Sequence, residues 1–240
     1  MLKIFVKLIL LITTSLLSFS LLADAKLDNE TEVGIAAANG NTQTETYNFK
    51  QTTQYKNVKD VFGLKSRYLN ATSEGEETAR YFLLSLRYEK EVSSRLGLFA
   101  QETFEKDRFA NIDQRFGTDI GGRYHFIETD PTKFFSELGY RYFHEDRLDG
   151  SQAYSNYGRL YTEWENKWRE TFSTKIWIEY LPNFTEQKDW QFNSELSLTA
   201  ILTEIFSLKS SFLLRRDNSP APGVKYKNDT LLTTAIVAKF

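Results

Sequence analysis

The chain has no cysteine, and its 240 residues include only two histidines and four prolines. The absence of cysteine excludes disulfide bonds, thiolate metal sites and cysteine nucleophiles, and it is compatible with an oxidising compartment. Strong charge of one sign is also missing, because the formal net charge is only −2 at pH 7. With no basic field to recruit nucleic acid, binding of DNA or RNA is not expected.

Long apolar runs are absent after residue 25, where nothing approaches the roughly 18 consecutive apolar residues of a membrane helix. The N-terminus differs, since Lys3 and Lys7 precede an apolar stretch over 8–22 that is followed by Ala23-Asp24-Ala25. This order is typical of a secretory signal peptide with an Ala-x-Ala cleavage site. A membrane helix is the alternative, but the stretch is shorter than the about 20 residues that a span needs. We therefore predict a signal peptide over 1–25 and a mature domain over 26–240.

The mature domain is rich in alternating segments and in aromatic residues, which make up 15% of the chain. From about residue 30 onward, polar and apolar residues alternate in segments of about ten to fifteen residues, and turn residues separate the segments. Such a pattern predicts a meander of antiparallel strands. We expect twelve strands, over 31–39, 42–56, 61–71, 78–90, 96–106, 112–126, 133–145, 153–165, 171–181, 190–202, 206–216 and 225–240.

Most segments have one apolar and one charged face. In 78–90, for example, Phe82 and Leu84 alternate with Arg87 and Glu89 on the opposite face. The segment 96–106 leaves its register open. There Leu98 and Phe99 compete for the apolar face, and choosing Leu98 would also place Glu102 on that face.

The chain ends in a strand that closes on an aromatic residue, Phe240, which shares a face with Leu232 and Ile236. Such an ending is typical of bacterial outer-membrane barrels. A soluble β-sandwich could bury the same apolar faces inside, but the signal peptide, the long strands and the aromatic residues near strand ends favour a membrane barrel. In hydrocarbon, a sheet must close on itself because its edge amides have no other partner.

The predicted fold is thus all-β: a closed antiparallel up-and-down transmembrane β-barrel of about twelve strands in the cell outer membrane. Both termini should lie on the periplasmic side, and the links at the opposite end should be longer on average. Expected partners are the outer-membrane lipid and the barrel-assembly machinery, which would read the C-terminal strand ending at Phe240. The sequence does not set the oligomeric state.

Several short motifs stand out along the chain. They are Val33-Gly34, Gly40-Asn41-Thr42, the segment 83–89 with the sequence Leu-Leu-Ser-Leu-Arg-Tyr-Glu, Asp107-Arg108-Phe109, and Gly121-Gly122-Arg123-Tyr124. Together they resemble the DUF481 family, which includes proteins called salt-induced outer membrane proteins. The resemblance implies an outer-membrane barrel and a link to envelope or salt stress. It implies no established reaction.

Catalytic chemistry has little support in the sequence. His144 shares the face of Tyr140 and Tyr142, but Asp146 stands where a lipid-hydrolase pattern of His-x-Ser would need the serine. A cation site at 144–146 is less expected than a solvated acidic loop. The pair Gly121-Gly122 lies inside a strand and indicates a bend or close packing rather than a phosphate loop. We predict no enzyme, no cofactor and no metal site, and we interpret His125 as a polar lumen residue.

The inferred inner face carries charges of both signs. Twelve strands fall between the filled eight-stranded barrels and the open sixteen-stranded porins, so a narrow pore for ions or small polar solutes is the leading functional prediction. A closed structural barrel without transport is the alternative, and a lipid-active enzyme is a weaker third. An excess of Lys and Arg would modestly favour anions if a path exists. The candidate lumen-lining residues are Lys50, Lys65, Arg67, Arg87, Arg115, Asp119, Arg123, Glu137, Arg141, Arg159, Glu163, Lys175, Glu179, Glu195, Lys209 and Arg215.

Overall fold

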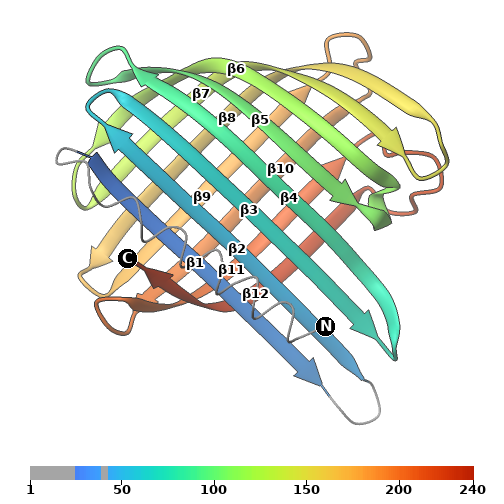
Figure 1. The fold of residues 1–240 in the computed structure, drawn as a ribbon, viewed down its shortest axis with the longest axis horizontal. Coiled ribbons are helices and arrows are strands. Elements are labelled where there is room, and N and C mark those ends of the chain that lie inside the picture. The colour runs from blue at the N-terminus through green and yellow to red at the C-terminus, as the bar shows by residue number, and fades with distance from the viewer. Residues whose placement is uncertain (1–24, 39–42) are drawn as a thin grey trace.

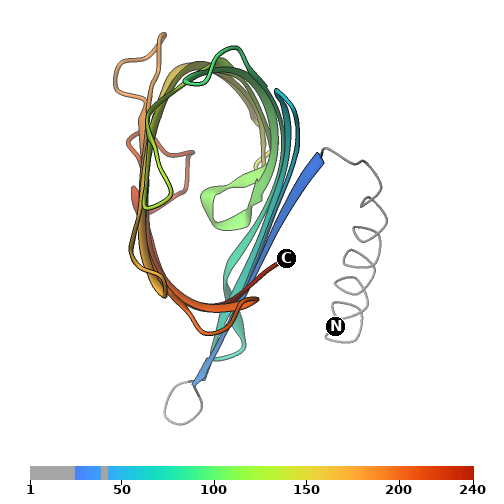
Figure 2. The ribbon, with the colours of Figure 1, turned by 90° about the vertical axis from the view of Figure 1, so that its left-hand side faces the viewer.

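The computed structural model describes residues 25–38 and 43–240, whose strands form one closed antiparallel barrel (Figures 1 and 2). Each strand pairs with its sequence neighbours, and β1 pairs with β12 to close the ring. No helix in the described ranges is long and apolar enough to cross a membrane. The strands are β1 (Ala25–Ala38), β2 (Thr44–Asn57), β3 (Asp60–Ser73), β4 (Glu76–Glu91), β5 (Leu96–Asp107), β6 (Ile112–Glu128), β7 (Thr132–Arg147), β8 (Gln152–Arg169), β9 (Phe172–Pro182), β10 (Trp190–Ile201), β11 (Phe206–Asp217) and β12 (Asn228–Lys239).

The predicted strand number and fold class are confirmed. The largest difference is at β1, which begins at Ala25 rather than at 31. Its first residues, such as Lys26 and Asp28, are polar and carry no clear alternation, so the pattern could not reveal this part of the strand. The predicted signal peptide lies outside the described residues, apart from Ala25, and its cleavage stays a prediction. The motif at 40–42 also lies outside them.

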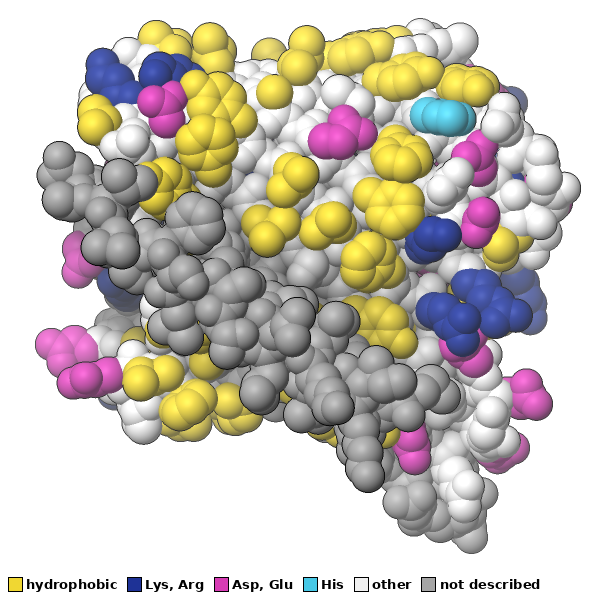
Figure 3. All heavy atoms as spheres, viewed as in Figure 1, with side chains coloured by type: hydrophobic (Ala, Val, Ile, Leu, Met, Phe, Trp, Pro, Cys, Tyr) yellow, Lys and Arg dark blue, Asp and Glu magenta, His cyan; other side chains and the backbone are white. Residues whose placement is uncertain are grey.

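The outer face of the barrel is apolar and carries aromatic residues near both ends. At the end that holds Ala25 and Phe240, the ring of Phe62 lies 5.2 Å from that of Tyr88. Toward the other end, Phe104 lies 5.2 Å from Phe116. Figure 3 shows apolar side chains spread over one side of the outer wall, with charged side chains mainly toward the two ends. This distribution matches the apolar band and aromatic girdles of membrane barrels.

The register of β5, left open by the sequence, is set by a glycine on the neighbouring strand β6. Leu98 points outward and is 53% exposed, whereas Phe99 points into the barrel and is 4% exposed. A Cβ atom at Gly121 would lie 2.8 Å from the Phe99 ring and 2.5 Å from the Leu138 carbonyl oxygen. A Cβ atom at Gly139 would lie 2.8 Å from the Ile120 carbonyl oxygen and 3.5 Å from the same ring, the second being an ordinary contact. The inner wall can accommodate the Phe99 ring because β6 has no side chain at Gly121. This agrees with the prediction of a bend or close packing at Gly121-Gly122.

The seam between β1 and β12 is short, with four register pairs from Glu30–Lys239 to Val33–Ile236. Beyond these pairs, the backbones of Asn29 and Phe240 exchange two hydrogen bonds, of 3.0 and 3.1 Å. Gly34 allows a close approach, because a Cβ atom there would lie 3.0 Å from the Thr234 carbonyl oxygen. The seam is therefore closed by backbone contacts at the very end of the chain.

The two ends of the barrel differ in their connections. The end with Ala25 and Phe240, called the turn end, has short links at 58–59, 92–95, 129–131, 170–171 and 202–205. At the opposite end, called the loop end, the links at 183–189 and 218–227 are the longest that the structure describes, as predicted. In the loop-end link 148–151, the hydroxyl and backbone N–H of Ser151 donate to Asp149, and these hydrogen bonds lower the pKa of its carboxyl group.

Candidate functional site

The inner wall formed by β4 and β6–β9 carries a dense network of ion pairs, which we call the central network. Glu137 lies at its centre and contacts Arg87 at 2.9 Å, Arg123 at 2.7 Å and Arg159 at 2.5 Å. Both Glu137 and Asp119 have side chains that are only 1% exposed. The central network consists of Arg87, Glu89, Asp119, Arg123, Glu137, Arg141, Arg159 and Glu179.

Arginine chemistry explains why this network can be so compact. Each guanidinium is a planar fork that can hold two carboxylates at once. Arg159 does so with Glu137 and Glu179, the second at 2.7 Å. The Arg87 guanidinium also lies 3.8 Å above the Phe99 ring, a cation–π contact. This side of the lumen is packed with side chains.

A second group crosses the lumen near the loop end, and we call it the loop-end cluster. Arg215 on β11 reaches Glu105 on β5 at 2.9 Å, although these strands lie on opposite sides of the ring. Arg215 also donates to the Tyr81 hydroxyl at 3.0 Å, and Glu105 pairs with Arg115 at 2.6 Å. The bridge therefore divides the lumen at this level into two parts.

A third group, the seam cluster, lies on the inner face near the β1–β12 seam. Lys50 on β2 contacts Glu195 on β10 at 3.1 Å, and Lys209 on β11 contacts Glu32 on β1 at 2.6 Å. Lys50 also lies 3.8 Å from Glu32. These four side chains join strands on both sides of the seam, so ion pairs rather than an apolar core fill this part of the lumen.

The lumen is more open toward the turn end along β2 and β3. Lys65 points inward from the middle of β3 and is nevertheless exposed, as is Gln54 on β2. Gly63, the next inward position of β3, has no side chain, and an added Cβ atom would meet nothing closer than 3.6 Å. Across the lumen on β9, the Lys175 side chain is 40% exposed although it pairs with Glu165 at 3.2 Å. Lys65 therefore borders a part of the lumen that side chains do not fill.

The loop-end mouth is narrowed by the link between β5 and β6. A short 3-10 helix, η2 (Arg108–Ala110), is capped by Asp107, whose carboxylate accepts from the backbone N–H groups of Phe109 and Ala110. The Asn111 side chain then donates to the Pro222 carbonyl at 3.2 Å, which joins this link to the one between β11 and β12. Viewed along the barrel in Figure 2, the green segment around η2 lies inside the ring of strands.

The candidate lumen residues fall into these regions. The central network takes Arg87, Asp119, Arg123, Glu137, Arg141, Arg159 and Glu179, the loop-end cluster takes Arg115 and Arg215, and the seam cluster takes Lys50, Glu195 and Lys209. Glu163 pairs with Lys175 at 3.4 Å in the open region. Lys65 and Arg67 belong to no cluster. The sequence reasoning missed the roles of Glu32, Glu89 and Glu105, and the undecided register of β5 hid the last of these.

The two histidines lie in different environments. His125 is on the inner face, with Nδ1 3.7 Å from Glu128 Oε2. His144 is on the outer face, where its ring stacks on Tyr154 at 4.8 Å between centroids. Within 25–38 and 43–240, His144 Nε2 has no hydrogen-bond partner, and no group of three or more His, Asp or Glu side chains is arranged to hold a metal ion. His144 thus has the surroundings of a residue in the aromatic belt.

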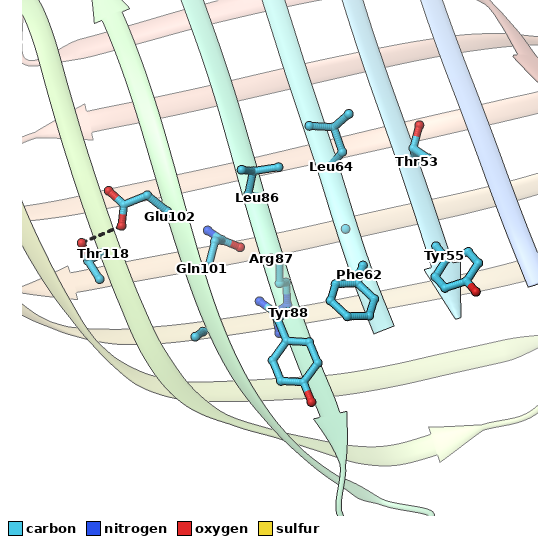
Figure 4. A pocket seen from close by; sticks show the side chains of 12 residues that line it. Thr53, Tyr55, Phe62, Leu64, Leu86, Arg87, Tyr88, Gln101, Glu102 and Thr118 are labelled. Carbon is cyan, nitrogen blue, oxygen red and sulfur yellow. Dashed lines mark hydrogen bonds between the residues drawn. The ribbon is translucent and has the colours of Figure 1, made fainter. Parts of the chain in front are cut away.

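A shallow groove of about 560 Å³ lies on the outer wall over β2–β6. Its lining is mostly apolar, with Phe62, Leu64 and Leu86 along one part (Figure 4). Glu102 lies at its edge and accepts a hydrogen bond of 2.7 Å from the Thr118 hydroxyl. This contact satisfies one oxygen of the carboxylate that made the β5 register ambiguous. The groove lies on the outside of the barrel and is separate from the lumen.

A closed barrel with an ion-paired interior and an apolar exterior with aromatic belts has the architecture of outer-membrane porins and channels. Solved structures share this fold. The NanC porin superposes with a TM-score of 0.52 at 11% identity, covering 89% of this chain and 98% of the porin. An outer membrane channel from Pseudomonas putida F1 also gives a TM-score of 0.52, at 13% identity, covering 92% of this chain and 97% of the channel.

The chain belongs to the DUF481 family, described as a protein family of unknown function, whose model matches residues 31–240. The resemblance seen in the sequence motifs is therefore confirmed. No curated protein matches the chain. Two of the family-like motifs have structural roles in this barrel: Gly34 allows β1 to approach β12, and Gly121 makes room for Phe99.

Proposed function

We propose that the protein is an outer-membrane barrel that forms a narrow pore for ions or small polar solutes, closed or narrowed by salt bridges. The observation that carries this proposal is the inward-pointing but exposed Lys65. A barrel filled by side chains would bury such a residue. Outer-membrane lipid would surround the apolar face, and the barrel-assembly machinery would receive the strand that ends at Phe240.

The path would run along the side of the lumen formed by β12 and β1–β3. Its inner residues toward the loop end are small or moderate in size, such as Thr46, Ala71 and Thr233. The seam cluster crosses this path, and its main contacts are the Lys50–Glu195 and Lys209–Glu32 pairs. Salt screens charge pairs, most strongly where water reaches them. Because these four side chains are only 7–19% exposed, screening should weaken their contacts only in part, and the path should widen modestly as ionic strength rises, which would link the pore to salt stress.

Single-channel conductance in planar bilayers tests the proposal. We expect discrete conductance steps that grow more steeply with KCl concentration than the conductivity of the solution does. Glu195→Gln removes one partner of Lys50 and should raise the conductance at low salt. Lys90→Gln is a matched control, because Lys90 pairs with Asp60 on the outer face.

The alternative is a closed structural barrel without transport. The Arg215–Glu105 bridge across the lumen favours it, as does the contact between Asn111 and Pro222 at the loop-end mouth. The absence of steps above the protein-free baseline, in both the parent and Glu195→Gln at all salt concentrations, would refute the pore and leave this alternative.

A further inference from the structure

Two inward-pointing cations on β3 differ from the other basic residues of the candidate lumen row. Lys65 and Arg67 form no ion pair with any carboxylate in the described ranges, whereas every other Lys and Arg of that row has one. The five carboxylates of the row, Asp119, Glu137, Glu163, Glu179 and Glu195, are all engaged by other cations. Lys65 and Arg67 are therefore the two cations of this row that have no carboxylate of the described residues within ion-pair distance.

The two side chains share one face and one stretch of strand. Residues two apart on a strand point to the same side and lie about 7 Å apart. Lys65 is exposed to the lumen, and the missing side chain of Gly63 leaves space beside it toward the turn end. Arg67 has no hydrogen-bond acceptor within 25–38 and 43–240, and its Nε atom is buried. Its contact is the Tyr81 ring, 5.8 Å from the guanidinium carbon.

A buried cation without a counter-charge is unfavourable, because it loses hydration and gains no paired anion. Neighbouring like charge increases the cost: Arg67 lies directly opposite Lys50 in the β2–β3 register. Lys50 itself already pairs with Glu195. An anion from solution that reaches this position through the open region would supply the counter-charge that Arg67 lacks.

We infer that Lys65 and Arg67 form an anion-binding site in the lumen, and that its ligand is an oxyanion. A guanidinium presents paired N–H donors that match the two oxygens of a carboxylate, phosphate or sulfate group, while the lysine ammonium adds a compact charge with three donors. A role of this site in ion selectivity rests on the proposed pore, since the two residues would favour anions along its path. Anion binding at the site can be measured without any conductance.

The binding test uses the full barrel in detergent and isothermal titration with inorganic phosphate at constant ionic strength. Lys65→Gln and Arg67→Gln should each weaken phosphate binding about tenfold, equivalent to the loss of one charge-assisted contact. Lys167→Gln, which removes an exposed cation paired with Asp130 at the turn end, should change nothing. A second titration with acetate separates the two sources of oxyanion: tighter binding of acetate assigns the site to carboxylates, and tighter binding of phosphate assigns it to inorganic oxyanions.

Circular dichroism and heat-modified electrophoretic mobility would show that each variant forms the barrel. Absence of phosphate and acetate binding in the parent would overturn the inference, as would equal binding in the Lys65→Gln, Arg67→Gln double variant. The reversal potential in a KCl gradient gives a second measure. The parent should favour chloride, and the double variant should lose that preference while conductance steps persist. Unchanged preference would refute the selectivity role with the pore intact, whereas missing steps in the parent would refute the pore and leave the binding result standing.

Discussion

The two sides of the lumen differ in how their charged side chains are buried and paired. On the side of β4 and β6–β9, Glu137 and Asp119 are almost fully buried and each is held by arginines. On the side of β2 and β3, Lys65 faces open space without a carboxylate partner. Charged residues on an inner face can therefore either pack into a buried core or border unfilled space inside the barrel. One barrel contains both.

Among the substitutions that test this contrast, Glu137→Gln should lower the free energy of unfolding the most. The substitution removes the charge that three arginines share while keeping a similar shape. Loss of one partner from a buried ion-pair group costs about 3–5 kcal/mol, because the remaining charges stay buried. We expect the free energy of unfolding to fall by this amount in guanidinium titrations of the barrel in lipid vesicles, followed by tryptophan fluorescence. A loss below about 1 kcal/mol, as for exposed pairs, would show that this side is hydrated too.

A matched pair of glycines gives the next largest effect. Gly121→Ala would place a Cβ atom 2.5 Å from the Leu138 carbonyl oxygen and 2.8 Å from Phe99, whereas Gly63→Ala meets nothing within 3.6 Å. Overpacking costs about 1–3 kcal/mol, so Gly121→Ala should destabilise the barrel by that amount. Gly63→Ala should be neutral or slightly stabilising, because alanine loses less backbone entropy than glycine on folding. Equal effects in the same unfolding assay would remove the distinction between the two sides.

The smallest effect is expected in the open region. Glu163→Gln weakens the contact with Lys175, whose side chain is 40% exposed, while the amide oxygen can still accept from Tyr161. A solvated pair contributes about 1 kcal/mol or less. The loss should shrink further as NaCl is raised, since salt screens hydrated charges. A salt-independent loss as large as that of Glu137→Gln would contradict an open lumen at the turn end.

Much of this architecture could be predicted from the sequence. Period-two alternation predicts strand number, and most strand faces follow from it, because a one-residue shift would place charges such as Arg87 on the lipid side. The β5 register could not be read in this way, because Leu98 and Phe99 are both apolar. It depends on Gly121, which lies opposite Phe99 on the paired strand β6 and leaves space for its ring.

The charge pairing inside the barrel was less predictable for a similar reason. Alternation indicates that Glu195 and Lys50 face inward, but their contact joins strands that are far apart in the sequence. The Arg215–Glu105 bridge depends in addition on the ring bringing β5 and β11 to opposite walls within side-chain reach. The lack of an ion pair at Lys65 and Arg67 can be recognised only when the ion pairs of the other lumen residues are known.

The short β1–β12 seam bears on how the chain reaches this state. All other strand pairs join sequence neighbours and can form as local hairpins, whereas the seam brings together the two ends of the chain. The entropy lost on closing a loop grows with its length, and contacts between distant residues slow folding. Formation of the backbone hydrogen bonds between Asn29 and Phe240 should therefore be the last step of folding. Before this step the chain would be an open curved sheet with two unpaired edges. These edges can pair with each other to close the barrel, and pairing of an edge with another chain would be the main competing reaction.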